Sequence, residues 1–492
     1  MEIIGPDNLK EVESLLIEAL QEGLNFKVQE RVATATLARG EHEQFFEEFP
    51  EKGIPVRELL TEFKTRLLPY CTNFGSPKFM GFPDAGNSVA AVAGGILSTL
   101  INQNLINQSF CSPVGTLAEI SVIQWLREAV GYDIRRKIRD IWDVGGIIMP
   151  GGTGSNAVGM MLARENRFPG TMQNGVQNLD GMHIVVPEGI GHYSVKSAQM
   201  WMGSGNRLIE VPTKDFRYDH DQLKRVIKDR KEQVMTVVGY CGDSRTMTVE
   251  DFQAVHDIVR TEDPGIWLHA DACHGFSLGF SPKLRHMIKG IEQFDSITTD
   301  PHKVMATPYV ISSLLVRDPT SLRTITSLSD LIMQEPFAFG QVTPFLGSRS
   351  WNSLKLWMMM KNAGRDGLAE LVDHRHEMAL YLEAKLNADD RFKVINKVNI
   401  NSVAFMYVDG IEENDIPTLN AVNKRIHDLI LQQGEYHLHQ FSIPDAGEFE
   451  KGAVIYPLRF MTGNMLITHE IIDDMIEYVC KLGNQITNGQ TE

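Results

Sequence analysis

From about residue 77 to residue 366, the hydrophobic residues of this chain fall into short runs separated by longer stretches of mixed character. A short apolar run is typical of a buried strand, whereas apolar positions that recur every three or four residues indicate an amphipathic helix. Strands that alternate with helices predict βαβ units and a mostly parallel sheet covered by helices. The predicted strands are 146–149, 184–187, 208–211, 234–238, 266–269, 296–299 and 309–316.

The regions on either side of this alternation have different patterns. Residues 7–70 mix apolar and charged residues at helical spacing, most clearly from Val56 to Leu68, without an evident core of their own. Beyond residue 367, predicted helices at 368–386, 421–433 and after Thr468 combine with strands at 392–395, 403–408 and 457–461. The pattern predicts an N-terminal helical segment (1–75), a large domain (76–366) and a small C-terminal α/β domain (367–492).

Composition narrows the class of protein. The 492 residues are 43% hydrophobic and 22% charged, as in an ordinary soluble protein with more than one domain. A formal charge of −16 disfavours nucleic acid and anionic membranes as partners. No apolar run approaches the roughly 20 residues that cross a bilayer, and the N-terminus has no signal-peptide pattern. Five cysteines without metal-type spacing indicate a reducing, cytoplasmic setting.

Lys303 is the first candidate for chemistry, because it follows His302 directly after the predicted strand 296–299. A lysine at such a position can form a Schiff base with a carbonyl cofactor, although most lysines are simply surface charges. Asp271 supports the cofactor interpretation, since it lies at the end of another apolar run, 303 − 271 = 32 residues upstream. That separation allows one helical crossover between two parallel strands.

A glycine-rich turn, Pro150–Asn156, follows the predicted strand 146–149 and leads into a helical pattern. A strand, a glycine turn and a helix N-terminus together form a common phosphate site, with Thr153 or Ser155 as hydroxyl donors. The spacing matches neither the Walker nor the dinucleotide pattern. A tight turn with a serine cap is the alternative interpretation.

His269, Asp271 and His274 close the run at 266–269, where parallel sheets place their ligands. Asp271 could keep a pyridine nitrogen protonated and so make the ring an electron sink. The same residues have a metal-ligand spacing, and they could also be no more than hydrogen-bonded polar groups at a strand end. His192 follows the run at 184–187 and could stack on a flat ring, or it could be a polar residue at the start of a helix.

Taken together, these segments resemble the pyridoxal-phosphate-dependent group II amino-acid decarboxylases, the family of the glutamate and aromatic amino-acid decarboxylases. The matches cover roughly residues 75–365 and follow the order in which the family has them. The sequence of Phe79–Asn87 is also similar to that of bacterial relatives acting on aliphatic amino acids. They include Phe79–Phe82, Asn102–Leu105, Ser112–Thr116, Gly151–Asn156, His192–Val195, His269–Ala272, Asp300–Lys303, Gly347–Ser350 and Leu354–Trp357.

The resemblance implies an α/β fold of the aspartate-aminotransferase type (fold type I) and pyridoxal 5'-phosphate (PLP) as the cofactor. It also implies an obligate homodimer with sites at the interface and an exchanged N-terminal helical segment, a part that residues 7–70 would play. The expected substrate is a small molecule, an amino acid, and no metal is implied.

The resemblance also gives the matching residues their roles in holding the cofactor. Lys303 would bind PLP covalently, Asp271 would pair with the pyridine nitrogen, and His192 would stack on the ring. These three residues, Lys303, His192 and Asp271, would be the catalytic ones. The remaining cofactor contacts would come from Gly154, Ser155 and His302 at the phosphate, Thr246 near the ring hydroxyl, and Gly347 and Ser348 at the phosphate of the neighbouring subunit.

Two further positions concern the substrate. Arg459 matches a C-terminal arginine that meets the substrate carboxylate in some relatives, and Pro113 belongs to a matching segment that would line the site. The implied reaction is decarboxylation of an L-amino acid to the amine and CO2.

The loop after Lys303 departs from the family pattern. Most relatives carry a tyrosine about 30 residues after the lysine, which protonates Cα, but here Tyr309 is the only tyrosine between Lys303 and Arg349. Phe337 and Phe339 occupy the expected loop. Either another acid, such as His192, replaces the tyrosine, or the chemistry differs. Oxidative deamination to an aldehyde and a PLP-dependent carbon–carbon lyase are the alternatives.

Overall fold

The computed structural model describes residues 3–33, 41–83, 86–134, 137–327, 336–412 and 415–489. A seven-stranded sheet forms its centre, in the order β1-β9-β8-β7-β6-β2-β3. Only β9 runs against the other six strands. The strands are β1 (Gly146–Met149), β2 (His183–Pro187), β3 (Leu208–Val211), β6 (Val234–Tyr240), β7 (Trp267–Asp271), β8 (Ser296–Thr299) and β9 (Ser312–Val316). The predicted, mostly parallel sheet is therefore confirmed.

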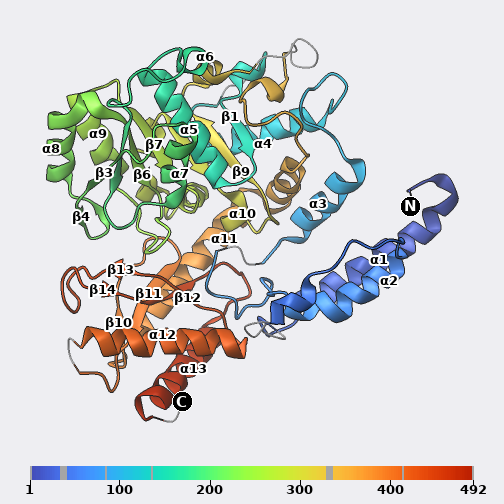
Figure 1. Cartoon of the computed structure of the whole chain (residues 1–492), viewed down its shortest axis with the longest axis vertical. Helices are drawn as coiled ribbons and strands as arrows, with labels where there is room; N and C mark the ends of the chain where they lie inside the picture. The colour runs from blue at the N-terminus through green and yellow to red at the C-terminus, as the bar shows by residue number, and fades with distance from the viewer. Residues whose placement is uncertain are drawn as a thin grey trace.

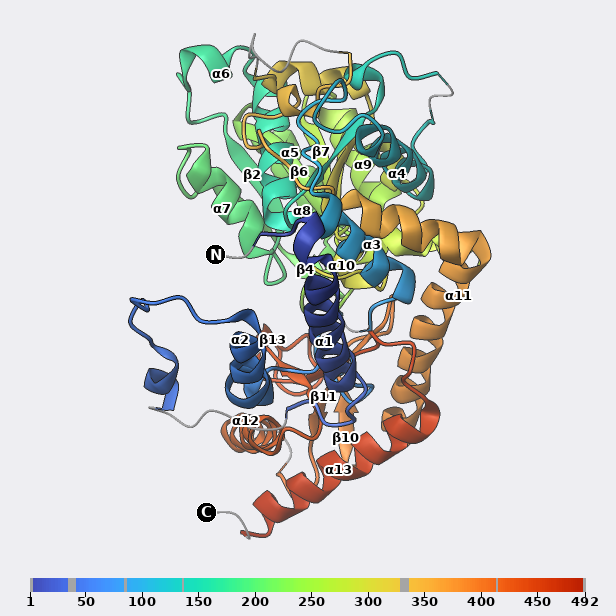
Figure 2. The same ribbon diagram turned by 90° about the vertical axis from the view of Figure 1, so that its right-hand side faces the viewer.

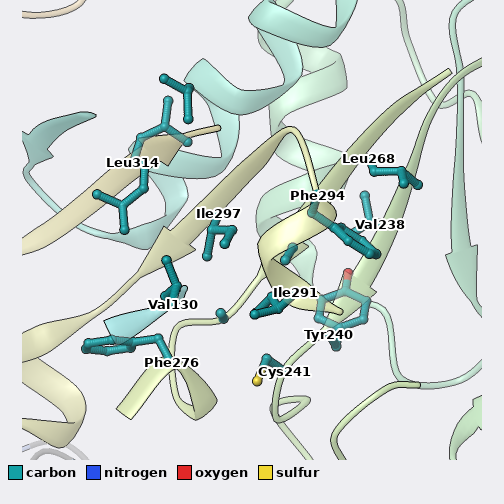
Figure 3. Close-up of a cluster of buried hydrophobic side chains, with 14 of the residues drawn as sticks. Val130, Val238, Tyr240, Cys241, Leu268, Phe276, Ile291, Phe294, Ile297 and Leu314 are labelled. Carbon is teal, nitrogen blue, oxygen red and sulfur yellow. The ribbon is translucent and has the colours of Figure 1, made fainter. Parts of the chain in front are cut away.

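The sheet has no solvent-facing side along its central strands. Every residue of β1, β6, β7, β8 and β9 is buried, although alternate side chains point to opposite faces. Figure 3 shows part of the core beneath it, where Val238, Leu268, Ile297 and Leu314 come from four adjacent strands. Apolar runs of this kind carry no alternation, which is why they could be recognised as strands covered on both faces.

Helices surround this sheet and link it to the rest of the chain (Figure 1). Helix α5 crosses the sheet and contacts β1, β6, β7, β8 and β9. The helices of the large region are α3 (Val89–Ile101), α4 (Gly115–Ala129), α5 (Gly152–Arg167), α6 (Thr171–Asn174), α7 (Tyr193–Trp201), α8 (His220–Arg230), α9 (Phe252–Glu262) and α10 (Pro301–Val304). A two-stranded ribbon, β4 (Thr213–Lys214) and β5 (Arg217–Tyr218), lies between β3 and α8.

The C-terminal region forms a second, four-stranded sheet in the order β10-β11-β15-β12. Its core is separate from the first and includes Phe405, Phe460 and Met475. The elements are β10 (Phe392–Val394), β11 (Ser402–Tyr407), α12 (Ile416–Gln433), β12 (His439–Gln440), β13 (Ile443–Pro444), β14 (Val454–Ile455), β15 (Leu458–Met461) and α13 (His469–Thr487). Thr468 caps α13, which is the helix predicted after that residue.

Helix α11 (Ser353–Asn387) joins the two regions and passes through the predicted boundary at residue 366. Gly364 has φ 62°, a left-handed conformation, so the helix is broken there while it continues on both sides. Further along, Arg375 donates one hydrogen bond to the carbonyl of Val304 in α10 and another of 2.6 Å to that of Gly463, beyond β15. We propose that the large and small domains divide at Gly364, because the helix that joins them is broken there.

The N-terminal segment projects from the body as a pair of helices, α1 (Leu9–Lys27) and α2 (Val56–Glu62) (Figures 1 and 2). Ion pairs of 2.6 Å join Glu18 to Arg57 and Glu22 to Lys64. Neither helix contains a buried residue, and apolar side chains stay exposed on both, among them Leu16, Ile17, Leu20, Leu24, Val56 and Leu59. This agrees with the expectation that the segment has no core of its own.

Several predicted boundaries were wrong. Strands 234–238 and 266–269 each end two residues later, because Gly239 pairs with Ala270 and Tyr240 with Asp271. The strand predicted to start at 309 begins at Ser312, since Tyr309 and Val310 are exposed. The helix predicted at 56–68 changes to a π-helical turn at Phe63. The helices predicted to start at 368 and 421 begin at 353 and 416.

Candidate active site

The carboxyl ends of the parallel strands bring the predicted site residues to one edge of the sheet. Lys303 follows β8 in the short helix α10, and Asp271 is the last residue of β7. His192 follows β2 and precedes α7, while the glycine turn follows β1. The pKa values reflect this closeness, since the charges of Asp271, Lys303 and Asp300 all act on His192. Ligands of open α/β sheets bind at this edge.

The amine of Lys303 lies 2.9 Å from Oδ2 of Asp300, a buried carboxylate that also accepts a 2.5 Å hydrogen bond from Ser312. Burial alone would lower the pKa of Lys303, but the charge of Asp300 outweighs it and the pKa is raised. Burial would likewise raise the pKa of Asp300, but Lys303 and His302 hold it below its usual range. Asp300 therefore keeps Lys303 as an ammonium ion until a carbonyl compound arrives.

This pair gives a pH-dependent prediction. Only the neutral amine attacks a carbonyl, so the raised pKa of Lys303 places its reaction with PLP at high pH. In Asp300→Asn the midpoint for formation of the visible absorption band, measured on addition of PLP to cofactor-free protein, should fall by roughly 1 to 3 pH units. Asp373→Asn is the matched control, because Asp373 pairs with Lys283 at 3.2 Å elsewhere. An unchanged midpoint in Asp300→Asn would contradict the assignment.

The glycine turn is built to accept an anion. Gly151 adopts φ 101°, after which α5 begins at Gly152, so Gly154 and Ser155 lie in its first turn. A Cβ atom at Gly152 would lie 2.7 Å from Oδ2 of Asp300, which leaves no room for a side chain there. The hydroxyl of Ser155 is buried and has no hydrogen-bond partner among the described residues. A buried hydroxyl at a helix N-terminus fits a phosphate that accepts its hydrogen bond.

Asp271 is held by an amide rather than by a cation. Its Oδ2 accepts a 2.8 Å hydrogen bond from Nδ2 of Asn156, and its Oδ1 accepts a 3.3 Å bond from the backbone N–H of Cys273. His269 lies behind Asn156, with one ring nitrogen 3.0 Å from Oδ1 of Asn156 and the other 2.7 Å from the hydroxyl of Ser296. Both nitrogens of His269 thus have protein partners, which argues against the metal interpretation. Among the described residues no group of three or more His, Cys, Asp or Glu side chains has a metal-binding arrangement.

His192 caps α7 at the mouth of the site. Its backbone N–H donates to the hydroxyl of Tyr240 at 2.9 Å, and its Nδ1 lies 2.6 Å from the hydroxyl of Ser194. Burial lowers the pKa of His192, so the imidazole is neutral near neutral pH. A neutral ring at this position can stack on a flat cofactor, and the contact itself stays a prediction.

His302 and Thr246 are already engaged within the protein. Nδ1 of His302 donates to the carbonyl of Ile311 at 2.6 Å, which leaves the other ring nitrogen as an acceptor. The hydroxyl of Thr246 lies 2.5 Å from Oδ2 of Asp243 and 2.9 Å from Oγ1 of Thr248. Its predicted contact with the ring hydroxyl would compete with these bonds, and the contact stays a prediction.

Arg459 lies on β15 and reaches from the small sheet towards the large one. Its guanidinium donates to the carbonyl of Ser244 and, at 3.1 Å, to that of Gly81. Two aromatic rings flank it, with Phe82 at 5.9 Å and Phe441 at 5.7 Å. Its buried Nε has no partner within the described part of the chain, and burial lowers the pKa of the guanidinium to about 10. The arginine can therefore still donate to an anion.

The three remaining predicted residues, Gly347, Ser348 and Pro113, are exposed. Ser348 accepts a 3.2 Å hydrogen bond from Asn104. The carbonyl of Pro113 accepts a 3.5 Å bond from Gln108. Neither Ser348 nor Pro113 has a hydrogen bond to the groups around Lys303, and the predicted contacts of all three residues with cofactor and substrate stay predictions.

Three residues of the site were not assigned a role from the sequence. Asn156 ends the glycine motif, but only the fold shows that it binds Asp271, 115 residues away. Asp300 begins the matching segment Asp300–Lys303, but only its ion pair with Lys303 shows what it does in the site. His274 is buried with an unpartnered Nδ1, and its pKa is lowered by burial and by Lys303, Arg459, His192 and His302. These effects show that His274 lies near the positively charged groups of the site, while its own ring is kept neutral.

A nucleophilic lysine, a carboxylate, a neutral imidazole and an anion-binding helix start are the groups that PLP requires. Combined with the seven-stranded sheet, they define the class of PLP-dependent fold type I enzymes.

Comparison with known proteins identifies the family within this class. Residues 40–408 match the model of the pyridoxal-dependent decarboxylase conserved domain. Human cysteine sulfinic acid decarboxylase is 27% identical over 380 residues, which cover 73% of each chain. Phenylacetaldehyde synthase of Petunia hybrida is 24% identical over 443 residues, covering 86% of this chain and 84% of the relative. The crystal structure of Oryza sativa TDC with PLP and tryptamine has the same fold, with a TM-score of 0.87 at 21% identity over 99% of this chain and 100% of that one.

The chain therefore belongs to the pyridoxal-dependent decarboxylase family. It is a PLP-dependent carboxy-lyase acting on an amino acid, which confirms the fold, the cofactor and the reaction class expected from the sequence. None of the helices in the described part of the chain is both long and apolar enough to cross a membrane.

Proposed function

We propose that Lys303, Asp271 and His192 form the reaction centre at which an L-amino acid is converted to its amine and CO2. The observation that carries the assignment is the meeting of these three side chains at one sheet edge, beside the unpartnered hydroxyl of Ser155. PLP, when bound, supplies an electron sink for the bond that breaks at Cα. The protein's own side chains bind the cofactor and orient the substrate.

Each of these residues has a separate task in the proposal. Lys303 would hold the cofactor covalently through its amine. Asp271 presents its carboxylate to the ring nitrogen and stabilises a proton there, with Asn156 holding the carboxylate in place. His192 covers the ring, while Gly154, Ser155 and His302 surround the phosphate.

Arg459 is the proposed anchor for the substrate carboxylate. The unpartnered Nε and the aromatic rings on both sides support this role, because a flanked guanidinium keeps a fixed orientation. An oriented carboxylate can be held where its bond to Cα is ready to break. Pro113 is proposed to lie near the substrate from the loop before α4, and Thr246 near the ring hydroxyl.

The second candidate outcome is decarboxylation with oxidative deamination. The similarity to a phenylacetaldehyde synthase favours it, as does the absence of a tyrosine other than Tyr309 in the segment after Lys303. In this reaction the amino acid, O2 and water give an aldehyde, CO2, ammonia and hydrogen peroxide. Phe339 does not support it, because the ring is fully buried beneath the guanidinium of Arg349, at 4.9 Å. Residues 328–335, where the predicted loop continues, lie outside the described residues.

The two outcomes are separated by their products. We expect a screen of the common amino acids for CO2 release to find a substrate that yields one amine per CO2, identified by mass, without peroxide. Running the same assay without oxygen is the control, because simple decarboxylation consumes none. Stoichiometric peroxide and aldehyde in place of the amine would exclude the leading proposal and support the second.

We further propose that two chains form a homodimer in the cytoplasm, with the α1–α2 pair packed on the partner. The exposed apolar residues of both helices support this, since a stable isolated helix pair normally buries such a stripe. Ser348 is exposed on the same chain, as a contact to the neighbouring phosphate would require. The scattered cysteines, none in a disulfide, agree with a reducing compartment.

A further inference from the structure

A continuous hydrogen-bonded chain links the two proposed catalytic residues Asp271 and His192, and Asn156 lies at its branch point. Nδ2 of Asn156 donates to Oδ2 of Asp271 at 2.8 Å and to the hydroxyl of Ser194 at 2.7 Å. Ser194 in turn lies 2.6 Å from Nδ1 of His192. On its other side, Asn156 meets His269, which meets Ser296, which meets Trp267.

The direction of every hydrogen bond in this chain follows from its far end. The indole N–H of Trp267 can only donate, and it does so to the hydroxyl of Ser296 at 2.8 Å. Ser296 keeps its own proton, which it can donate to Nδ1 of His269, 2.7 Å away. The single proton of a neutral His269 therefore lies on Nε2 and points at Oδ1 of Asn156, 3.0 Å away.

The other end of the chain gives the same direction. A carboxylate can only accept, so Asp271 requires the NH2 group of Asn156 and not its carbonyl oxygen. That orientation presents the second N–H of the amide to Ser194 and leaves Oδ1 for His269. Nδ1 of His192 receives the backbone N–H of Ser194 at 3.4 Å, which marks it as an acceptor, so the hydroxyl of Ser194 accepts from Asn156 and donates to His192.

We propose that Asn156, His269 and Ser194 are positioning residues that fix the proton of His192 on Nε2 while orienting the carboxylate of Asp271. The inference rests on the proposed catalytic roles of His192 and Asp271. It adds that one amide sets the geometry of both, so that the acidic N–H of the imidazole faces away from Ser194 in every molecule. A ring with a fixed tautomer presents the same donor to whatever lies beside it.

The surroundings of the chain favour this pattern of protons. Trp267, Ser296, His269, Asn156 and Ser194 are all buried, so bulk water does not exchange with these groups. Burial lowers the pKa of His269 to about 4, which keeps the ring neutral with a single proton. The hydroxyl of Thr298, 3.5 Å from Nε2 of His269, is too distant to displace Asn156.

His192 itself is surrounded by groups from several elements. Asp271, Lys303, Asp300 and Arg245 act on its charge, and its backbone N–H binds the hydroxyl of Tyr240. The donor from Ser194 adds to these effects by stabilising the neutral imidazole, because a nitrogen that accepts a hydrogen bond is harder to protonate. Loss of that donor should therefore raise the pKa of His192.

The test compares Ser194→Ala with Thr236→Val in the PLP-bound protein. Thr236 is the matched control, since its buried hydroxyl donates to the backbone carbonyl of Trp267 at 2.8 Å and lies outside the chain. We expect the acid limb of the kcat/KM profile to move up by roughly 0.5 to 1 pH unit in Ser194→Ala. In Thr236→Val the acid limb of the kcat/KM profile should lie at the same pH as in the unaltered enzyme. Equal limbs in all three proteins would overturn the proposal.

A second measurement does not depend on activity or on the folding of a variant. Neutron diffraction from the deuterated, unaltered protein locates the protons of His192 and His269 directly. Deuterium on Nε2 of both rings supports the proposal, and deuterium on Nδ1 of His192 overturns it. Should no amino acid be decarboxylated, the proposed function fails, but the neutron map still decides the tautomer.

Discussion

Lys303→Ala is expected to abolish catalysis, with kcat lower by on the order of 10³-fold or more, and to release PLP on dialysis. The reason is that no other described lysine amine has Lys303's place at the carboxyl end of β8, within reach of a cofactor on Asp271 and Ser155. Loss of the amine removes both the covalent attachment and the group that accepts exchange with the substrate. The measurements are steady-state rates with the screened substrate and the visible absorption of the dialysed protein.

Two variants separate the covalent role of Lys303 from its charge. Lys303→Arg keeps a cation beside Asp300, so it should fold like the unaltered protein and still lack the visible band. Lys355→Met removes another partly buried lysine, whose amine donates to the carbonyl of Tyr309 at 2.8 Å, and it should keep the band. Retention of the band in Lys303→Arg would disprove the assignment of the lysine.

Asp271→Asn is expected to lower kcat by roughly 10² to 10⁴-fold while PLP stays attached through Lys303. An amide is nearly the same size as a carboxylate, but it carries no charge to hold a proton on the ring nitrogen. The substituted side chain would also place an amide against Nδ2 of Asn156, which needs an acceptor. The visible band at equal cofactor occupancy, read together with kcat, distinguishes lost chemistry from lost binding.

Asp243→Asn is the control for this second variant. Asp243 is also buried and accepts hydrogen bonds from Thr246 and Thr248, but it sits in the turn after β6 and not at the end of β7. A loss in Asp271→Asn that is no larger than in Asp243→Asn would show that Asp271 acts only through stability.

The sheet and the principal site residues could be predicted because both depend on local sequence. A strand buried on both faces is a mostly apolar run, and the site residues lie at its carboxyl end or within a few residues after it. Lys303, Asp271 and His192 all stand in such places. The resemblance to a family then supplied their roles.

The remaining features depend on contacts that sequence spacing does not encode. Tyr240 and Asp271 extend their strands because they pair with each other, although glycine and aspartate usually end a strand. Helix α11 begins 15 residues before its predicted start of 368, at 353, because Gly364 interrupts its pattern without ending it. Asn156 was visible as part of a turn, but its three partners come from two distant elements, β7 and α7.

The two hydrogen bonds of Arg375 connect the small domain to α10, the helix that carries Lys303. Its guanidinium donates to the carbonyl of Val304, directly after Lys303, and to that of Gly463, just beyond β15, the strand that carries Arg459. Hydrogen bonds to a charged group contribute about 1.5–3 kcal/mol each, so pulling the two ends apart has a definite energetic cost. These bonds therefore restrain the distance between the amine of Lys303 and Arg459, the proposed carboxylate anchor, and that distance would limit which amino acids reach both groups.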